Sequence, residues 1–298
     1  MVFRPKGQKQ AFARLVQRGG KGPIFVPMKR YLIVPVACLL TLAACSPSAE
    51  GPVDLRWDYS AEQTWTYAFS QHSTSLSTTT LMTEDDEPFT DTTRYQTRAK
   101  GDLLVVSHGD GTASWTIEGL QLTAVDLDPS SGTPLDSGTQ DIPPLQSADR
   151  DDAGFLVDEQ TDENVLFAYL FSLPVVSLSR GETIIDSVAL PMPALGVPLP
   201  LRSVRSIRFA GMEKRQGIHC AKLQTTFTVR ASDLPPEFQD AYKLSRTGQA
   251  VGWFDLEAGH YVESEVTLSS TVDFDAGPAV GRMQVDSEDR FTVRFTKP

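Results

Sequence analysis

The chain has 298 residues, of which 40% are hydrophobic and 22% are charged, and its 27 Lys and Arg against 38 Asp and Glu give a formal net charge of −11. This balance is typical of a globular chain that buries a core, and it excludes a wholly disordered one. The acidic excess disfavours nucleic acid as a partner.

The N-terminal 44 residues differ in charge from the rest of the chain. They hold eight Lys and Arg but no Asp or Glu, which leaves residues 45–298 with a formal charge of −19. Lys29 and Arg30 precede an apolar run over 31–42 that is too short to span a bilayer comfortably, and small residues follow it. This order predicts a signal peptide over 28–44. Residues 1–27 are then either the product of a start codon assigned too early, with Met28 as the true start, or a genuine basic extension.

The end of this signal, Leu42-Ala43-Ala44-Cys45, resembles the lipobox of bacterial lipoproteins. The resemblance implies cleavage before Cys45, a diacylglycerol on its thiol and a third acyl chain on the new N-terminus, which together anchor a protein stably to a membrane. By analogy with enteric bacteria, Ser46 favours the outer over the inner membrane. The alternative is that Cys45 is an ordinary cysteine behind a cleavable secretory peptide or in a buried helix.

Cysteine usage agrees with export. Cys38 would leave with the signal peptide and Cys45 would be acylated, so Cys220 alone remains and no intramolecular disulfide can form. Residues 45–52 are small and polar, as a tether between lipid and domain should be. We expect residues 53–298 to form a single β-rich domain.

The first part of this domain alternates apolar and polar residues. The pattern predicts strands over 53–59 and 65–69, joined around 60–63, with aromatic side chains on one buried face. These side chains are Trp57, Tyr59, Trp65, Tyr67 and Phe69. Most such stripes are core, but in a sheet that curls without closing they could instead line a cavity for an acyl chain or another apolar ligand.

The middle of the chain is less regular. Residues 70–94 read as either a long polar strand or a mobile loop, with the acidic cluster 84–87 as a loop. Strands are expected over 102–107 and 114–125, with a glycine turn over 108–112 and a bulge at Gly119. Residues 126–160 read as a polar excursion that could be ordered or disordered. Thr161 or Asp162 can cap a short helix over 165–171, and the proline-rich 190–201 reads as a cover strip outside any strand ladder.

The C-terminal part shows the clearest alternation. It predicts strands over 203–209, 221–229, 262–274 and 291–295, a short helix from 232 to about 244, and short connections over 210–217 and 257–259. Short connections favour antiparallel neighbours. The fold class expected is therefore mainly β, as a large curved antiparallel sheet or open half-barrel with one or two short helices.

Part of this region supports the same fold by a second resemblance. Residues 252–264 (GWFDLEAGHYVES), preceded by 217–223 (GIHCAKL), resemble paired strands of uncharacterised bacterial surface lipoproteins, whose sheets wrap like those of periplasmic lipoprotein carriers. The resemblance implies a fold more than an activity.

Residues with catalytic or metal-binding potential are few. The chain has four histidines, His72, His108, His219 and His260. His108 could pair with Asp110, but turn chemistry explains both residues, and adjacent His219 and Cys220 point to opposite faces of a strand. His260 reads as a solvated turn residue.

The chain lacks the common catalytic and metal-binding motifs. The nucleophile-elbow, zinc-protease and Walker motifs are missing from the sequence. An acidic group lacks the spacing of a calcium loop and reads as a solvated face. It comprises Asp149, Asp151, Asp152, Asp158, Glu159, Asp162 and Glu163. No catalytic residue, metal or cofactor is therefore assigned.

Three hypotheses on function follow. The leading one is a membrane-anchored envelope lipoprotein, attached through Cys45, that acts as a non-enzymatic binding or assembly module for an envelope protein partner. The second is a carrier of a lipid or other apolar ligand in a half-barrel cavity. The third is an enzyme with a non-standard site.

Overall fold

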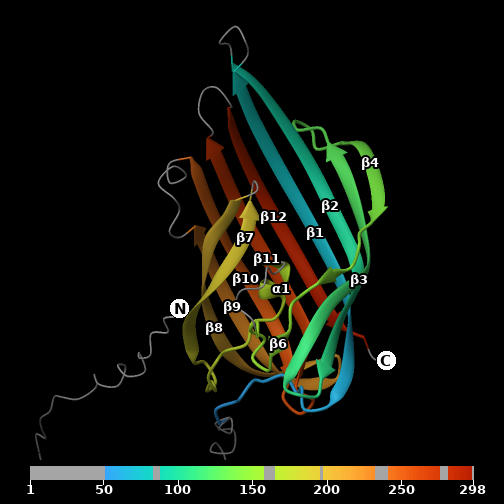
Figure 1. Ribbon diagram of the computed structural model, residues 1–298, viewed down its shortest axis with the longest axis vertical. Helices are drawn as coiled ribbons and strands as arrows, with labels where there is room; N and C mark the ends of the chain where they lie inside the picture. The colour runs from blue at the N-terminus through green and yellow to red at the C-terminus, as the bar shows by residue number, and fades with distance from the viewer. Residues whose placement is uncertain are drawn as a thin grey trace, which may run out of the picture. The chain divides into compact units, whose positions relative to one another are not determined.

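The computed structural model describes residues 51–82, 88–157, 165–194, 197–231, 241–275 and 281–296. Most of them belong to one open antiparallel sheet in the order β4-β3-β2-β1-β12-β11-β10-β9-β8-β7, with β5 and β6 also paired to β3 (Figure 1). The strands are β1 (Glu62–Met82), β2 (Pro88–His108), β3 (Thr112–Leu127), β4 (Pro134–Asp141), β5 (Leu145–Gln146), β6 (Arg150–Asp151), β7 (Thr183–Ala194), β8 (Val197–Arg215), β9 (Ile218–Ala231), β10 (Tyr242–Asp255), β11 (His260–Asp275) and β12 (Arg282–Phe295). The expectation of a large antiparallel sheet that does not close is confirmed.

The two halves of the sheet meet where β1 pairs with β12. The ladder runs from Tyr67 opposite Phe295 to Thr80 opposite Arg282. The polar stretch over 70–94 is thus a long strand for most of its length, one of the two alternatives that its composition left open. The acidic cluster 84–87 lies outside the described residues.

The single described helix, α1 (Val165–Leu170), lies against β11 and β7 on the inner face of the sheet (Figure 1). Two side chains of β11 satisfy carbonyl groups at its C-terminal end: Ser264 Oγ donates to Leu170 O at 2.5 Å, and Tyr261 Oη donates to Ser172 O at 2.9 Å. These bonds fix the helix where its orphan carbonyls would otherwise be buried. The helix expected over 165–171 is confirmed, while its expected cap at Thr161 or Asp162 lies outside the described residues.

The first expected strand is wrong. Residues 53–59 contribute only one bridge, between Val53 and Leu178, although the next expected strand forms part of β1. Backbone bonds run instead from Trp57 N to Asp152 O and from Asp58 N to Gly259 O. The segment is extended, so its alternate side chains are still buried, but its partners are loops rather than a hairpin.

The turn and bulge expected around β3 are confirmed. Gly109 and Gly111 adopt positive φ between β2 and β3, and Gly119 has φ of 59° where the register with β2 shifts. The polar excursion that follows carries β4, β5 and β6, which all pair back onto β3. Those pairings are not anticipated by the sequence pattern, because β4 is exposed on both faces and shows no alternation in burial.

The proline-rich segment is not a cover strip. It forms the end of β7 and the start of β8, where Pro191 faces Pro200 and Pro193 faces Pro198. In an antiparallel pair, two facing residues either exchange both backbone hydrogen bonds with each other or direct their N–H and C=O groups away from each other. The facing prolines occupy the pairs whose backbone groups are directed away from each other, so the β7–β8 ladder loses no hydrogen bond. On its other side, β8 pairs with β9 only from Leu201 onward, so these prolines are not needed as donors there either.

Two boundaries near β8 and β10 also differ from expectation. Residues 242–244, expected in a helix, belong to β10, because Tyr242 and Leu244 alternate inward with polar neighbours. The rest of that expected helix, 232–240, lies outside the described residues. The connection expected over 210–217 is strand up to Arg215, with a bulge at Gly211 and a tight turn at Gln216 and Gly217, which have φ of 50° and 87°.

Candidate functional site

The five aromatic residues singled out in the sequence lie together and are all buried. Trp57 is at the centre, 5.7 Å from the ring of Tyr59 and 5.8 Å from that of Trp65. Tyr67 contacts Phe171, which follows α1, at 5.5 Å between ring centroids. Phe69 belongs to the same core cluster.

Other rings fill the space around this group. Trp57 also lies 5.7 Å from Trp115, 5.3 Å from Phe171, 6.2 Å from Phe254 and 5.8 Å from Tyr261. Burial raises the pKa of the Tyr261 hydroxyl well above its usual range. This end of the inner face is therefore packed with the protein's own side chains, and an apolar ligand would have to displace them.

The histidines do not form an acid–base site. His108 Nε2 lies 3.5 Å from a carboxylate oxygen of Asp149 at the surface. Asp110 instead accepts from the backbone and hydroxyl of Thr112, which hold its pKa below the usual value. His72 Nε2 lies 3.2 Å from Gln96 Nε2. The expected separation of His219 and Cys220 holds: His219 is exposed, Cys220 is buried, and burial raises the pKa of its thiol to about 11.

The expectation of a solvated His260 is wrong. Its ring is buried, with Nδ1 2.8 Å from Tyr261 O, and it lies 4.5 Å from the ring of Phe295. The sequence could not show this, because the turn at Gly259 folds against Asp58 from a distant segment. Burial is the largest influence on the ring and lowers its pKa below 6.5.

We predict that His260 makes the protein sensitive to mild acid. A group whose folded pKa is lowered contributes stability above its unfolded pKa, and this contribution is lost as the pH falls toward the folded pKa. Unfolding in urea should therefore show a steeper loss of stability between about pH 7 and 5 for the wild type than for His260→Phe. Parallel curves would contradict this prediction.

Of the acidic residues considered for calcium, Asp151 binds the backbone of the following turn. Asp151 Oδ1 accepts from the backbone N–H groups of Ala153 and Phe155, at 3.0 and 2.9 Å. Within the described ranges, no three His, Cys, Asp or Glu side chains gather to hold a metal ion. Asp158, Glu159, Asp162 and Glu163 lie outside those ranges.

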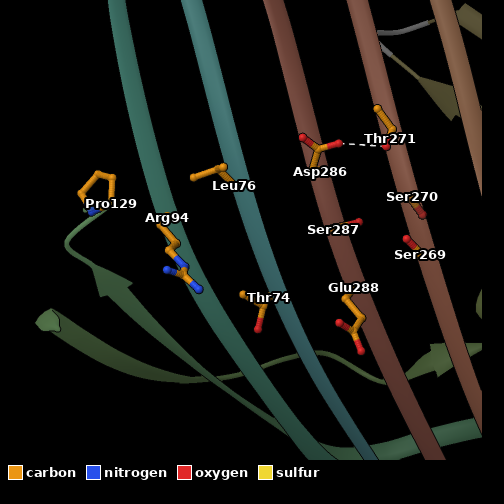
Figure 2. Close-up of a pocket in the computed structure, with 10 residues that line it drawn as sticks. All are labelled: Thr74, Leu76, Arg94, Pro129, Ser269, Ser270, Thr271, Asp286, Ser287 and Glu288. Carbon is orange, nitrogen blue, oxygen red and sulfur yellow. Dashed lines mark hydrogen bonds between the residues drawn. The ribbon is translucent and has the colours of Figure 1, made fainter. Parts of the chain in front are cut away.

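A groove of about 450 Å³ (Figure 2) lies over residues 74–76 of β1 and 286–288 of β12, further along these strands than the aromatic rings of Trp65, Tyr67 and Phe69 and on the face that those rings do not occupy. Its floor follows the register: Arg94 on β2, Leu76 on β1, Asp286 on β12 and Thr271 on β11 form one row across four strands. Pro129, between β3 and β4, lies at one side of it. The alternation of the sequence does not predict this feature. Its only signal is one leucine in a long polar stretch.

The chemistry of the groove is polar. Asp286 accepts from the Thr271 hydroxyl at 2.8 Å and from the Gln284 amide at 3.2 Å, so both of its oxygens are engaged. Glu288 adds a second carboxylate and Arg94 a cation, while Leu76 is the exposed apolar surface between them. This arrangement suits a hydroxyl-rich or mixed-charge surface better than an acyl chain.

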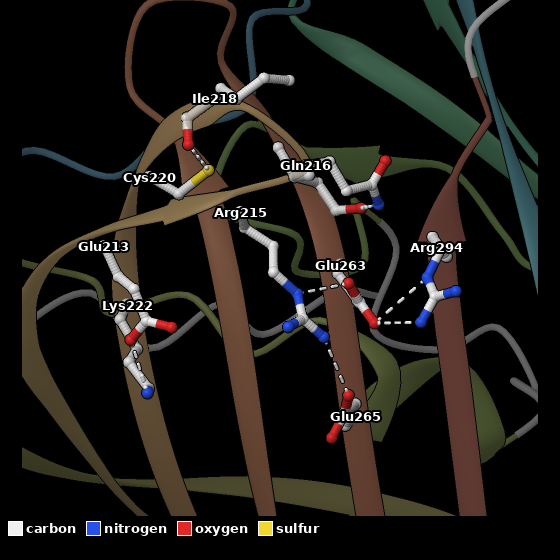
Figure 3. Close-up of polar contacts among 10 residues, drawn as sticks. Glu213, Arg215, Gln216, Ile218, Cys220, Lys222, Glu263, Glu265 and Arg294 are labelled. Carbon is white, nitrogen blue, oxygen red and sulfur yellow. Dashed lines mark hydrogen bonds and ion pairs between the residues drawn. The ribbon is translucent and has the colours of Figure 1, made fainter.

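A second polar cluster lies elsewhere on the outer face, around a buried carboxylate (Figure 3). Glu263 is 1% exposed and accepts from Arg215 Nε at 2.6 Å and from Arg294 Nη2 at 2.8 Å. Arg215 also stacks over Trp253, with 4.2 Å from its guanidinium carbon to the ring centroid, and donates to Glu265 at 3.2 Å. Burial alone would raise the pKa of Glu263, but the two guanidinium groups outweigh it and lower the pKa. Glu263 on β11 thus binds Arg215 on β8 and Arg294 on β12, so this cluster links the three strands.

Over the described residues, α1 is far shorter than a membrane-crossing helix, and no helix with the length and hydropathy of a transmembrane span occurs.

No family model matches the chain, and no curated protein matches it in sequence. Among solved structures, the chain is similar to lipovitellin, from a study of lipid–protein interactions in that protein, with 11% identity and a TM-score of 0.40 over 78% of this chain. It spans about a quarter of the lipovitellin chain, 25%. It is also similar to the hypothetical lipoprotein YmcC of Escherichia coli, with 12% identity and a TM-score of 0.27 over 77% of this chain and 84% of that one. Both TM-scores lie below 0.5, so neither likeness assigns a function.

Proposed function

We propose that this chain is a lipid-anchored protein of the bacterial cell envelope whose open sheet is a non-enzymatic binding or assembly module. The observation that carries the proposal is the position of Cys45, which ends a lipobox-like signal and lies only eight residues before Val53, the first residue with a described pairing. An acyl group on Cys45 would hold the β-rich body next to a membrane. Ser46 favours the outer membrane.

Within this proposal, the groove over β2, β1, β12 and β11 is the surface offered to a partner. Its carboxylates, hydroxyls and single guanidinium group provide directional hydrogen bonds around an apolar patch, as specific surfaces require. No residue is given a catalytic role.

The first test is replacement of the proposed acylation site. In cells fed an alkyne-tagged palmitate, we expect the wild-type protein to take up the tag and to sediment with membranes. Cys45→Ser should abolish tagging and leave the protein in the soluble fraction. Cys220→Ser removes the buried thiol and is the matched control, which should keep both properties. Equal tagging of the wild type and Cys45→Ser would overturn the anchor.

A carrier of apolar ligands is the second candidate. It is favoured by half-buried apolar side chains that continue the inner face beyond α1, with Val272 opposite Val285 and Phe274 opposite Met283. Lipid extraction of protein purified from its host, followed by mass spectrometry, tests it. A stoichiometric apolar molecule besides the anchor would support carriage, and extracts that contain only the acyl groups of Cys45 would contradict it.

A further inference from the structure

The 174–177 loop, just after α1, exposes two neighbouring aliphatic side chains. Val175 is 46% and Val176 is 50% exposed, although the leucines on either side, Leu173 and Leu178, are buried. Isolated exposed valines are ordinary on a protein surface. Here, two of them project from a segment that is fixed in the core at both ends.

The loop is joined to the segment that follows the tether. Val53 and Leu178 exchange both backbone hydrogen bonds, at 2.9 and 3.0 Å. Three residues further on, Arg56 donates from Nη2 to Val175 O at 2.9 Å and from Nη1 to Pro174 O at 3.5 Å. The chain that leaves the proposed anchor therefore arrives at the loop and satisfies two of its carbonyl groups.

These bonds affect what the loop can contact. A backbone carbonyl that enters an apolar medium is costly unless it has a partner within the protein. Arg56 supplies that partner for Pro174 and Val175 while its own cationic head remains partly exposed. The loop can thus present its two side chains to a nonpolar phase at a smaller desolvation cost than an unsupported loop would pay.

The length of the tether limits where the loop can be. Eight residues separate Cys45 from Val53, and such a segment reaches at most about 26–29 Å when fully extended. As a flexible coil it would average about 15 Å, which keeps Val53 close to the headgroups when Cys45 carries acyl chains.

We propose that Val175 and Val176 insert into the interface of the lipid bilayer that holds Cys45, so that the loop is a second membrane contact that fixes the orientation of the sheet. This inference rests on the proposed lipid anchor. The acidic body, with its formal charge of −19 over residues 45–298, would be repelled by anionic lipid, so the attraction at this contact comes from the burial of the two valines.

The test places a fluorescent probe at the loop. Full-length Val176→Cys, expressed with its native signal, purified from membranes in detergent and labelled with an environment-sensitive maleimide dye, is reconstituted into vesicles of phosphatidylethanolamine and phosphatidylglycerol that contain a doxyl-labelled lipid. Cys220 is buried and should stay unlabelled. The matched control is Val204→Cys, a valine of similar exposure (45%) on β8 with no bond to the tether segment.

We expect the dye at 176 to shift to the blue and to be quenched by the doxyl lipid at least about twofold more than the dye at 204. Flotation with the vesicles together with equal quenching at both positions would overturn the loop contact and leave the anchor standing. Failure to float would overturn the anchor and the loop contact together. A blue shift at 176 without lipid quenching would mean that the dye is covered by protein rather than by lipid, and it would also overturn the proposal.

Discussion

Trp57→Ala is expected to lower the free energy of unfolding by about 3–5 kcal/mol, the largest loss of any single aromatic truncation in the domain. Trp57 touches six other aromatic rings at centroid distances of 5.3 to 6.2 Å and is 2% exposed. These rings come from β1, β3, β10, β11 and the segments around them, so the cavity left by truncation would loosen contacts between both halves of the sheet.

Chemical denaturation followed by circular dichroism measures this loss. Trp57→Phe should retain part of the stability, because a smaller ring can still fill some of the space. Leu135→Ala, on the exposed strand β4, is the control and should change stability by less than about 0.5 kcal/mol. If Trp57→Ala cost no more than Leu135→Ala, the aromatic face would not be packed core and a ligand site there would have to be reconsidered.

Glu263→Gln is expected to cost about 1–3 kcal/mol at neutral pH. The substitution keeps the shape of the side chain but removes the charge that two arginines share, and a hydrogen bond between charged groups is worth more than a neutral one. Arg215 and Arg294 are partly exposed, so water screens part of the loss and the cost stays below that of a fully buried pair.

The same variant should change the pH dependence of stability. The folded pKa of Glu263 is lowered, so its contribution is complete above the unfolded value, near 4.5, and is lost as the pH falls through the folded value. Stability of the wild type should therefore fall more steeply than that of Glu263→Gln below about pH 4.5, and the two curves should converge in strong acid.

Glu265→Gln is the matched control for this ion pair. Glu265 binds the same Arg215, at 3.2 Å, but about half of its side chain is exposed, so its loss should cost under about 0.5 kcal/mol. Equal effects of the two glutamine variants at neutral pH would show that the burial of Glu263 does not matter to its ion pairs.

Local pattern predicted much of the fold. Alternation placed most late strands and the buried face of Trp65, Tyr67 and Phe69, and the glycines at 109, 111 and 119 marked a turn and a bulge that the structure confirms. These features depend on neighbours within a few residues. The strand over 190–201 could not be predicted, because a proline is tolerated where its nitrogen points away from the paired strand, and that depends on the partner.

The contacts that could not be predicted are those between distant segments. Alternation predicted the strand over 262–274 that carries Glu263, but the burial of this carboxylate depends on Arg215, 48 positions away, and on Arg294, 31 positions away. The buried state of His260 likewise depends on Trp65 and Phe295. The groove needs four strands in register, and no single stretch of sequence encodes it.

The pairing of β1 with β12 also has a consequence for how the protein is made. β1 is the first strand along the described chain and β12 follows all the others, yet the two share a ladder of more than a dozen facing residues. Because a chain is synthesised from its N-terminus, one long edge of β1 stays unpaired until β12 has been made. During that interval the open edge of β1 is a site where the nascent chain can pair with another chain and aggregate.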